Sequence, residues 1–280
     1  MPDAPEDDMS FVEVERLEWR SGALIRDSDQ VAREEPLELR IAGVAIAVVM
    51  RTPGHDEELA RGFLLAERIV ARADQILTIR HCTTVDVPEA EDNILQIRLA
   101  DEVAIDLAGL RRNLYTTSSC GVCGKASIAA ALAPSLDLHV DSDLRVAASI
   151  LLALPERLRA DQRVFDRTGG LHAAGLFDRL GQPLVVREDV GRHNAVDKVI
   201  GWAAERGLEF AALILFVSGR VSFELIQKAA ALGVPILAAV SAPSSLAIEL
   251  ARAAGITLIG FVRGERMCVY SGEQRIDPAA

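Results

Sequence analysis

The sequence predicts a layered α/β domain in its carboxy-terminal part, preceded by a smaller mixed α+β domain. Three short continuous apolar runs, AALILFVS, VPILAAVS and ITLIGFV, suit strands that are covered on both faces. Two segments with helical spacing, SFELIQKAAAL and SSLAIELARAA, lie between these runs. Strands and helices that alternate in this way are typical of a parallel sheet with helices packed on it.

The amino-terminal part predicts a hairpin, a helix and two more strands. The hairpin is LELRIAGVAIAVVMRT, which alternates and then runs apolar around an Ala-Gly turn signal. The helix is TPGHDEELARGFLLAERIV, with acidic residues in its first turn, and the strands are ILTIRHCTTV and ILQIRLA. The acidic start, MPDAPEDDMS, reads as a solvated tail. A boundary near residue 112 gives two predicted domains, 1–112 and 113–280.

Further elements are expected just before the three apolar runs. GLHAAGLF and PLVVRE flank DRLGQ as a hairpin, and HNAVDKVIGWAAER has the spacing of a helix. Asp189 is a candidate cap for that helix.

The net charge and its distribution along the chain limit the kinds of ligand that the protein is expected to bind. The chain has 280 residues and a net charge of −11, which argues against a general nucleic-acid binder. Residues 1–110 hold 24 acidic residues against 11 arginines, whereas the remainder holds 17 against 19 basic residues. We therefore expect an anionic ligand, if any, in the carboxy-terminal part.

The compartment follows from what the sequence lacks. No apolar run approaches the ~20 residues of a membrane span, and the acidic start does not resemble a secretory signal. Four cysteines in a chain of this length do not make a disulfide framework. We therefore expect a cytoplasmic protein without a membrane partner.

Cys120 and Cys123 form a Cys-x-x-Cys pair in TTSSCGVCGKASI. The following GKASIAAALA predicts a helix that ends before Pro134, and a helix amino terminus favours a thiolate. Lys125 adds a positive charge, so the sequence predicts at least one activated thiol. A zinc site, a thioredoxin-like pair and ordinary buried thiols remain open. For Cys82 and Cys268, packing in the core is the expected role.

Polar segments leave the three predicted strands, where ligands bind in parallel sheets. They are SGRVS, with Ser218, Gly219 and Arg220; SAPSS, which leads into a helix amino terminus; and RGER, with Arg263 and Arg266. Arginine suits bidentate contact with phosphate, so the three loops together predict a phosphate-bearing ligand.

Expected roles can also be given to several charged residues outside these loops. REDVGRHNAVDK holds two further candidate ligand-binding residues, His193 and Lys198. His172 is expected in the core. Glu224 and Lys228 are expected to form a solvated pair on one helix face.

Several longer motifs follow one another along the chain. They are SSCGVCGK, TGGLHAA, REDVGRHNAVDKVIG, SGRVSFELIQKAA and FVRGERMCVY, with MRTPGHDEELARGFLLAERI near the start. Together these motifs resemble the FdhD family of formate dehydrogenase accessory sulfurtransferases. The resemblance runs from about residue 35 to 271. Its departures are minor: the GER of the last motif and the acidic tail.

The resemblance implies a sulfurtransferase, or sulfur carrier protein, with defined partners. A cysteine desulfurase would donate sulfur as a persulfide, formate dehydrogenase would be the client, and the protein would be a homodimer. The bound substrate would be molybdenum bis(molybdopterin guanine dinucleotide), with guanine nucleotides expected at the same site.

The resemblance also assigns residues and a fold. Cys120 would form the persulfide and Cys123 would support the transfer. The cofactor-binding stretch would be FVRGER, which comprises Phe261, Val262, Arg263, Gly264, Glu265 and Arg266. The family implies a cytidine-deaminase-like fold.

Two alternatives remain beside this interpretation. One is a non-catalytic chaperone that binds the molybdenum cofactor. The other is a zinc-binding deaminase-like protein, but the His-x-Glu and Pro-Cys-x-x-Cys of zinc deaminases are missing from the chain. We therefore expect no metal of the protein's own.

Overall fold

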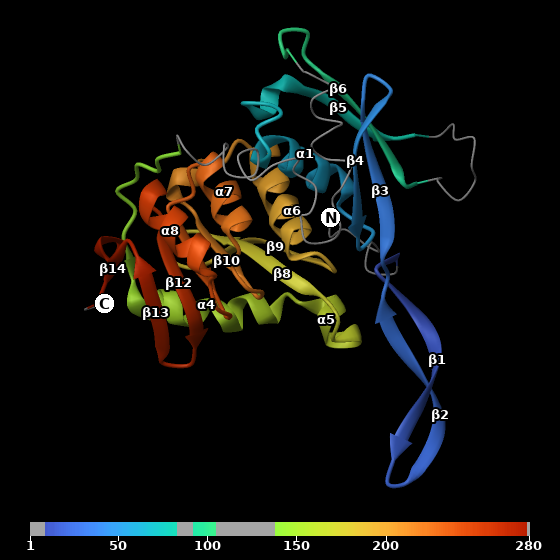
Figure 1. The fold of residues 1–280 in the computed structure, drawn as a ribbon. Coiled ribbons are helices and arrows are strands. Elements are labelled where there is room, and N and C mark those ends of the chain that lie inside the picture. Colours follow the sequence, from blue (N-terminus) through green and yellow to red (C-terminus); the bar gives the residue numbers. More distant parts are fainter. Residues whose placement is uncertain (1–8, 83–91, 105–137, 279–280) are drawn as a thin grey trace.

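The structure is a computed structural model that describes residues 9–82, 92–104 and 138–278. These residues form a six-stranded sheet with helices on both faces, a four-stranded sheet beside it, and a two-stranded ribbon that extends away from both (Figure 1).

The six-stranded sheet carries the carboxy-terminal half of the chain. In spatial order its strands are β13 (Arg266–Ser271), β12 (Thr257–Arg263), β11 (Ile236–Ala239), β10 (Ile214–Val217), β8 (His172–Phe177) and β9 (Pro183–Asp189). The three apolar runs form β10, β11 and β12, and these strands pair in parallel, as predicted. The predicted hairpin forms β8 and β9. The sheet is nevertheless mixed, because β8 joins β10 and β13 joins β12 in antiparallel fashion.

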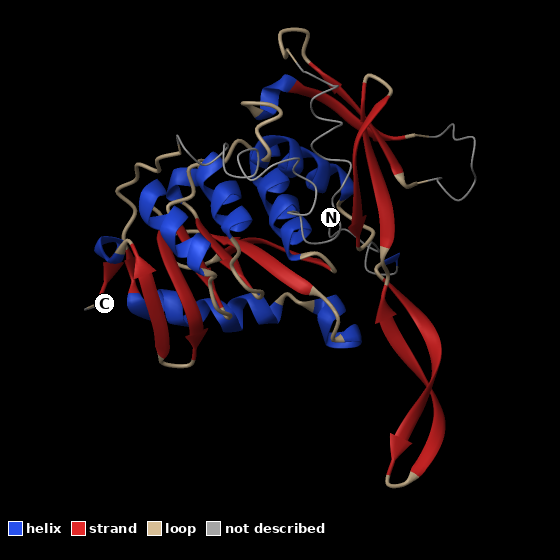
Figure 2. Cartoon of the chain, in the orientation of Figure 1, coloured by secondary structure: helices blue, strands red, loops and turns tan. Residues whose placement is uncertain are grey.

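Helices cover both faces of this sheet (Figure 2). One layer holds α6 (Arg192–Glu205), α7 (Phe223–Ala231) and α8 (Ser245–Ala254), and the other holds α4 (Ala148–Ala160). Alternate residues of β10 enter the two layers: Leu215 and Val217 pack toward the first, and Ile214 and Phe216 toward the second. The short helix α5 (Arg163–Thr168) continues the α4 layer, and β7 (Val146–Ala147) pairs with β14 (Ile276–Asp277) at its edge. Neither α4 nor α5 was anticipated from the sequence.

The amino-terminal sheet has the order β4 (Val44–Arg51), β3 (Glu35–Ile41), β6 (Ile94–Leu99), β5 (Ile76–His81). The predicted β3–β4 hairpin is confirmed, and Ala42 and Gly43 take positive φ values of 50° and 78° in its turn. One face of the sheet packs on α1 (Asp56–Ala66), which is the predicted helix.

The two parts of the chain meet where α1 crosses α6. A Cβ atom added to Gly62 would lie 1.8 Å from the backbone oxygen of Asp197, and one added to Gly201 would lie 1.8 Å from that of Glu58. Glycine on both helices therefore allows the two backbones to touch, and this contact fixes the amino-terminal sheet against the larger one.

The ribbon formed by β1 (Phe11–Arg20) and β2 (Ala23–Ala32) was not anticipated. Its base contacts α5, where the guanidinium of Arg167 lies 4.9 Å from the ring centroid of Phe11. The predicted helix after Cys123 and the boundary near residue 112 lie outside the described residues. Within the parts of the chain that are described, no helix is long and apolar enough to cross a membrane.

Candidate functional site

The carboxyl ends of the parallel strands lie at one edge of the large sheet, as expected. The segment after β10 is held by Ser218, whose backbone N–H donates to Ala173 O and whose hydroxyl accepts the N–H of Ala173, each at 2.9 Å. The segment after β11 is tied to β12, because Phe261 N–H donates to Ser241 O at 3.1 Å and Arg263 Nε donates to Val240 O at 3.4 Å. The three strand ends therefore form one continuous rim.

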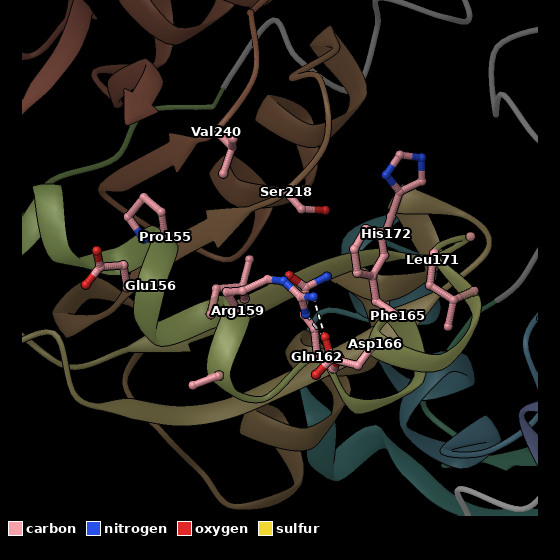
Figure 3. Close-up of a pocket in the computed structure, with 14 residues that line it drawn as sticks. Pro155, Glu156, Arg159, Gln162, Phe165, Asp166, Leu171, His172, Ser218 and Val240 are labelled. Carbon is pink, nitrogen blue, oxygen red and sulfur yellow. Dashed lines mark hydrogen bonds and ion pairs between the residues drawn. The ribbon is translucent and has the colours of Figure 1, made fainter. Parts of the chain in front are cut away.

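A pocket of about 1060 Å³ opens at this rim, on the α4 side of the sheet. Its walls combine the strand ends with α4 and α5 (Figure 3). The lining residues are Pro155, Glu156, Leu158, Arg159, Ala160, Gln162, Phe165, Asp166, Gly169, Gly170, Leu171, His172, Ser218 and Val240. Its volume lies just above the roughly 300–1,000 Å³ that is typical of small-molecule and cofactor pockets.

Arg159, Phe165 and Asp166 form the polar and aromatic part of the α4–α5 wall. The Arg159 guanidinium lies 4.8 Å from the ring centroid of Phe165 and pairs with the Asp166 carboxylate. Glu188 accepts hydrogen bonds from the backbone N–H groups of Val164 and Phe165, at 2.9 and 2.8 Å, and so fixes the start of α5. This wall could contact both a planar ring and an anion.

The predicted stretch 261–266 forms the end of β12 and the turn into β13. Phe261 has a positive φ of 53° at an irregularity in the β12–β13 pairing, which is a strained conformation for a phenylalanine. Arg263, Gly264, Glu265 and Arg266 are exposed, and Val262 is buried. The structure therefore places both arginines on the surface at the rim, with Arg263 touching the backbone of a pocket residue.

His193 lies at the start of α6, on the other face of the sheet. Its Nε2 is 3.0 Å from Glu224 Oε2 and 3.1 Å from Ser222 Oγ. Burial lowers the pKa of His193, although the hydrogen bond with Glu224 acts to raise it. A neutral imidazole that donates from Nε2 to the carboxylate would leave Nδ1 as a hydrogen-bond acceptor.

Lys198, a candidate ligand-binding residue, is buried in α6 and not exposed at the rim. It is 1% exposed, and its Nζ lies 2.8 Å from Asp189 Oδ2 and donates to Thr52 O at 2.9 Å. Asp189, expected as a helix cap, is fully buried and also accepts from the N–H groups of Thr52 and Gly191. A buried ammonium group must be paired with polar groups. The contacts of Lys198 with Asp189 and Thr52 join α6 to the end of β9 and to the residue that follows β4.

Glu224 and Lys228 are buried, so the expected solvated pair between them is wrong. Lys228 Nζ instead lies 2.8 Å from Asp197 Oδ1 and 3.2 Å from Glu67 Oε1. Burial favours the neutral amine, but the two carboxylates outweigh burial and raise the pKa of Lys228. This group of charges joins α7, α6 and the end of α1.

His172 and the cysteines complete the predicted residues. His172 is half-buried and lines the pocket, so it is not a core histidine; burial, followed by Arg192 and His193, lowers its pKa. Cys82 and Cys268 are half-buried, so neither is a fully buried core residue. Cys120 and Cys123 lie outside the described residues. Among the described residues, no group of three or more His, Cys, Asp or Glu side chains could hold a metal ion.

The sequence did not single out Arg159, Gln162, Phe165 or Asp166. They lie on α4, on α5 and at the junction between them, and they reach the pocket only because these two helices pack on the sheet. Their one visible signal is the polar run RLRADQRVFDR, which stands just before TGGLHAA.

The fold defines a class of α/β protein whose parallel strands end at one rim, and α/β sheets commonly bind ligands at that edge. Within that class the chain belongs to the FdhD/NarQ family, whose pattern matches residues 32–277.

Similar proteins cover most of the chain. It is 50% identical over 260 residues to the sulfur carrier protein FdhD of Streptomyces avermitilis, which covers 92% of each chain. It is 52% identical over 258 residues to that of Mycobacterium tuberculosis, which covers 90% of this chain and 94% of the relative. A solved structure described as a candidate formate dehydrogenase accessory protein, from Desulfotalea psychrophila, has a TM-score of 0.75 at 23% identity. It covers 95% of this chain and 99% of its own, which supports the fold.

Proposed function

We propose that this chain is a sulfurtransferase that carries sulfur on Cys120 and delivers it to molybdenum bis(molybdopterin guanine dinucleotide) for formate dehydrogenase. The names of its relatives support the sulfur-carrying role. Binding of the cofactor is supported by one observation: the strand ends after β10, β11 and β12 form a continuous rim, and Arg263 lies beside the pocket at that rim. Phosphates would bind the exposed arginines, and a planar base or pterin would enter the pocket.

The loading step requires a thiolate. Cys120 would attack the outer sulfur of a persulfide on a cysteine desulfurase, so that a new S–S bond forms and the donor's S–S bond breaks. The donor leaves as a thiolate with the electron pair, and the proton stays on the transferred sulfur. Such exchange is fastest for a thiol whose pKa is near the ambient pH.

The release step requires two electrons, because the carried sulfur must become sulfide. A Cys123 thiolate that attacks the inner sulfur would supply them. The products are hydrosulfide, which binds molybdenum, and a Cys120–Cys123 disulfide, which a cellular thiol reductant would reopen. This step gives Cys123 its supporting role.

Sulfur loading tests the proposal directly. The protein is incubated with a cysteine desulfurase and cysteine, and its intact mass is measured before and after reduction. A carrier gains the mass of sulfur in a form that reductant removes, and Cys120→Ala abolishes the gain while Cys82→Ala keeps it. A chaperone that only binds the cofactor would show no gain, and that result would refute sulfur transfer.

Guanine nucleotide binding tests the site. The double variant Arg263→Ala/Arg266→Ala should weaken GDP binding by about tenfold or more, because each substitution removes a charge-assisted hydrogen bond to phosphate. Arg179→Ala, an exposed arginine in the β8–β9 turn, is the matched control. Unchanged affinity in the double variant would place the phosphates elsewhere.

The remaining family properties are also proposals for this chain. A homodimer predicts twice the mass of the chain in light scattering, and the rival zinc-binding protein predicts zinc in freshly purified material.

A further inference from the structure

The outer face of the amino-terminal sheet is basic, although it lies in the acidic part of the chain. The inner face of β3, β5 and β6 packs on α1 through apolar residues such as Leu39, Ile79 and Leu95. The opposite face carries Arg40, Gln96, Arg98, Thr78 and Arg80. No described helix packs on this face (Figure 2).

The strand register places the arginines around one glutamine. Gln96 on β6 lies opposite Arg40 on β3 and opposite Arg80 on β5, so the three side chains form a row across three strands. Arg98 is the next residue of β6 on the same face and lies opposite Thr78. Arg80 and Arg98 are therefore diagonal neighbours, with backbones roughly 7–8 Å apart.

The charges on this face are not balanced. Arg40 pairs with Glu38 beside it. Arg80 and Arg98 are both exposed, and neither forms an ion pair with any residue that the structure describes. Like charges placed this close do not stabilise a sheet. The pair therefore has no evident structural role.

Arg80 and Arg98 line a groove of about 640 Å³. Its walls include Thr78, Arg80, Gln96, Arg98 and the segment Ala100–Asp101. An extended segment presents side chains of one face about every 6.6–6.8 Å, which matches the diagonal spacing of the two arginines. Two carboxylates separated by one residue could each meet one guanidinium.

We propose that this groove is a docking surface for an acidic, extended segment of a partner protein, with carboxylates at alternate positions. Charge complementarity identifies the partner, because Arg80 and Arg98, which form no ion pair with the described residues, stand beside a polar amide in a concave site. The proposal does not depend on sulfur transfer, since its residues lie in the amino-terminal sheet and not at the rim.

The test uses the full chain and a fluorescein-labelled hexapeptide of alternating glutamate and threonine, with fluorescence anisotropy as the readout. We expect saturable binding that weakens as salt rises from 50 to 300 mM, because the pairs are exposed. Arg80→Glu/Arg98→Glu should weaken it by about tenfold or more. The control Arg179→Glu/Arg252→Glu makes the same change in net charge on the other part of the protein and should leave binding intact.

Further arms separate the alternatives. Equal binding of a peptide with glutamine in place of glutamate, or equal binding by the Arg80/Arg98 variant, would overturn the proposal. So would capture of phosphatidylglycerol vesicles in place of the peptide. Peptide binding that requires removal of residues 1–8 would also overturn it, because the chain's own acidic end would then be the occupant. The variant should keep the Tm of the wild type, which rules out loss of folding.

Discussion

His193 Nε2 lies 3.0 Å from Glu224 Oε2, and this contact joins the first turn of α6 to the first turn of α7. Both side chains are almost buried, with exposed fractions of 12% and 9%. Ser222, between the end of β10 and α7, contacts the same imidazole nitrogen. The pair therefore sets the orientation of a histidine at the loop that carries Ser218, Gly219 and Arg220.

Glu224→Gln should lower the pKa of His193 further. Burial already lowers it, and the carboxylate acts in the opposite direction, so removing the negative charge leaves burial less opposed. An NMR titration of the His193 ring measures the shift, with Glu249→Gln on the exposed face of α8 as control. A higher pKa in Glu224→Gln would contradict this account of the pair.

His55→Asn should reduce the sensitivity of the protein to acid. Burial, followed by Arg187 and Lys198, lowers the pKa of His55 from 6.5 to about 3. The unfolded chain therefore binds a proton that the folded chain does not. This linkage is absent above pH 6.5, and it removes stability as the pH falls from 6.5 toward 3. His55 contributes at most about 2 kcal/mol of the loss between pH 7 and pH 5.

Asparagine suits position 55 because it tolerates the positive φ of 58° there. Urea unfolding at pH 7 and pH 5 measures the slope, with His139→Asn as an exposed control. An equal loss of stability in wild type and His55→Asn would show that other groups carry the acid sensitivity.

Lys198→Met should destabilise the fold by roughly 3–5 kcal/mol, because it leaves the Asp189 carboxylate buried and uncompensated. Lys198→Met/Asp189→Asn should recover part of that loss. Denaturant unfolding measures both variants. If Lys198 instead contacts the cofactor, the folded Lys198→Met protein should lose GDP affinity without losing stability, and that result would support the prediction made from the sequence.

Gly62→Ala and Gly201→Ala should each lower the free energy of unfolding by at least about 2 kcal/mol. The added methyl group meets backbone atoms of the facing helix, which cannot rotate away, so α1 and α6 must separate. Gly170→Ala is the control, because its new Cβ would meet only ordinary contacts at 3.7 Å or more. A Tm unchanged in Gly62→Ala would show that the crossing is looser than described.

Much of the fold could be predicted because short patterns of apolar, polar and turn-forming residues determine where its strands and helices form. The apolar runs of β10, β11 and β12 are too continuous for a half-exposed strand, and their buried positions confirm this interpretation. The Ala42–Gly43 turn and the helix α1, with its acidic first turn, were likewise predicted from local sequence. The ribbon β1–β2 was missed because its exposed, charge-rich strands lack a buried face to give a clear alternation.

The site was only partly predictable. The rim residues Ser218 and Arg263 follow from strand order, because parallel strands end at one edge. The α4–α5 wall did not follow, since residues 155–172 reach the pocket by packing beneath the sheet rather than by sequence spacing. The surroundings of Lys198 could not be predicted, because its motif is dense in charged groups and only the structure pairs this buried lysine with the buried Asp189.

The sequence by itself determined the strand and helix order, the family resemblance and the candidate sulfur-carrying thiol, because each depends on residue type and short spacing. Only the tertiary structure decided which charges face a ligand and which neutralise one another. Burial and pairing depend on segments that are distant in the chain, as when Glu67 and Asp197 meet Lys228.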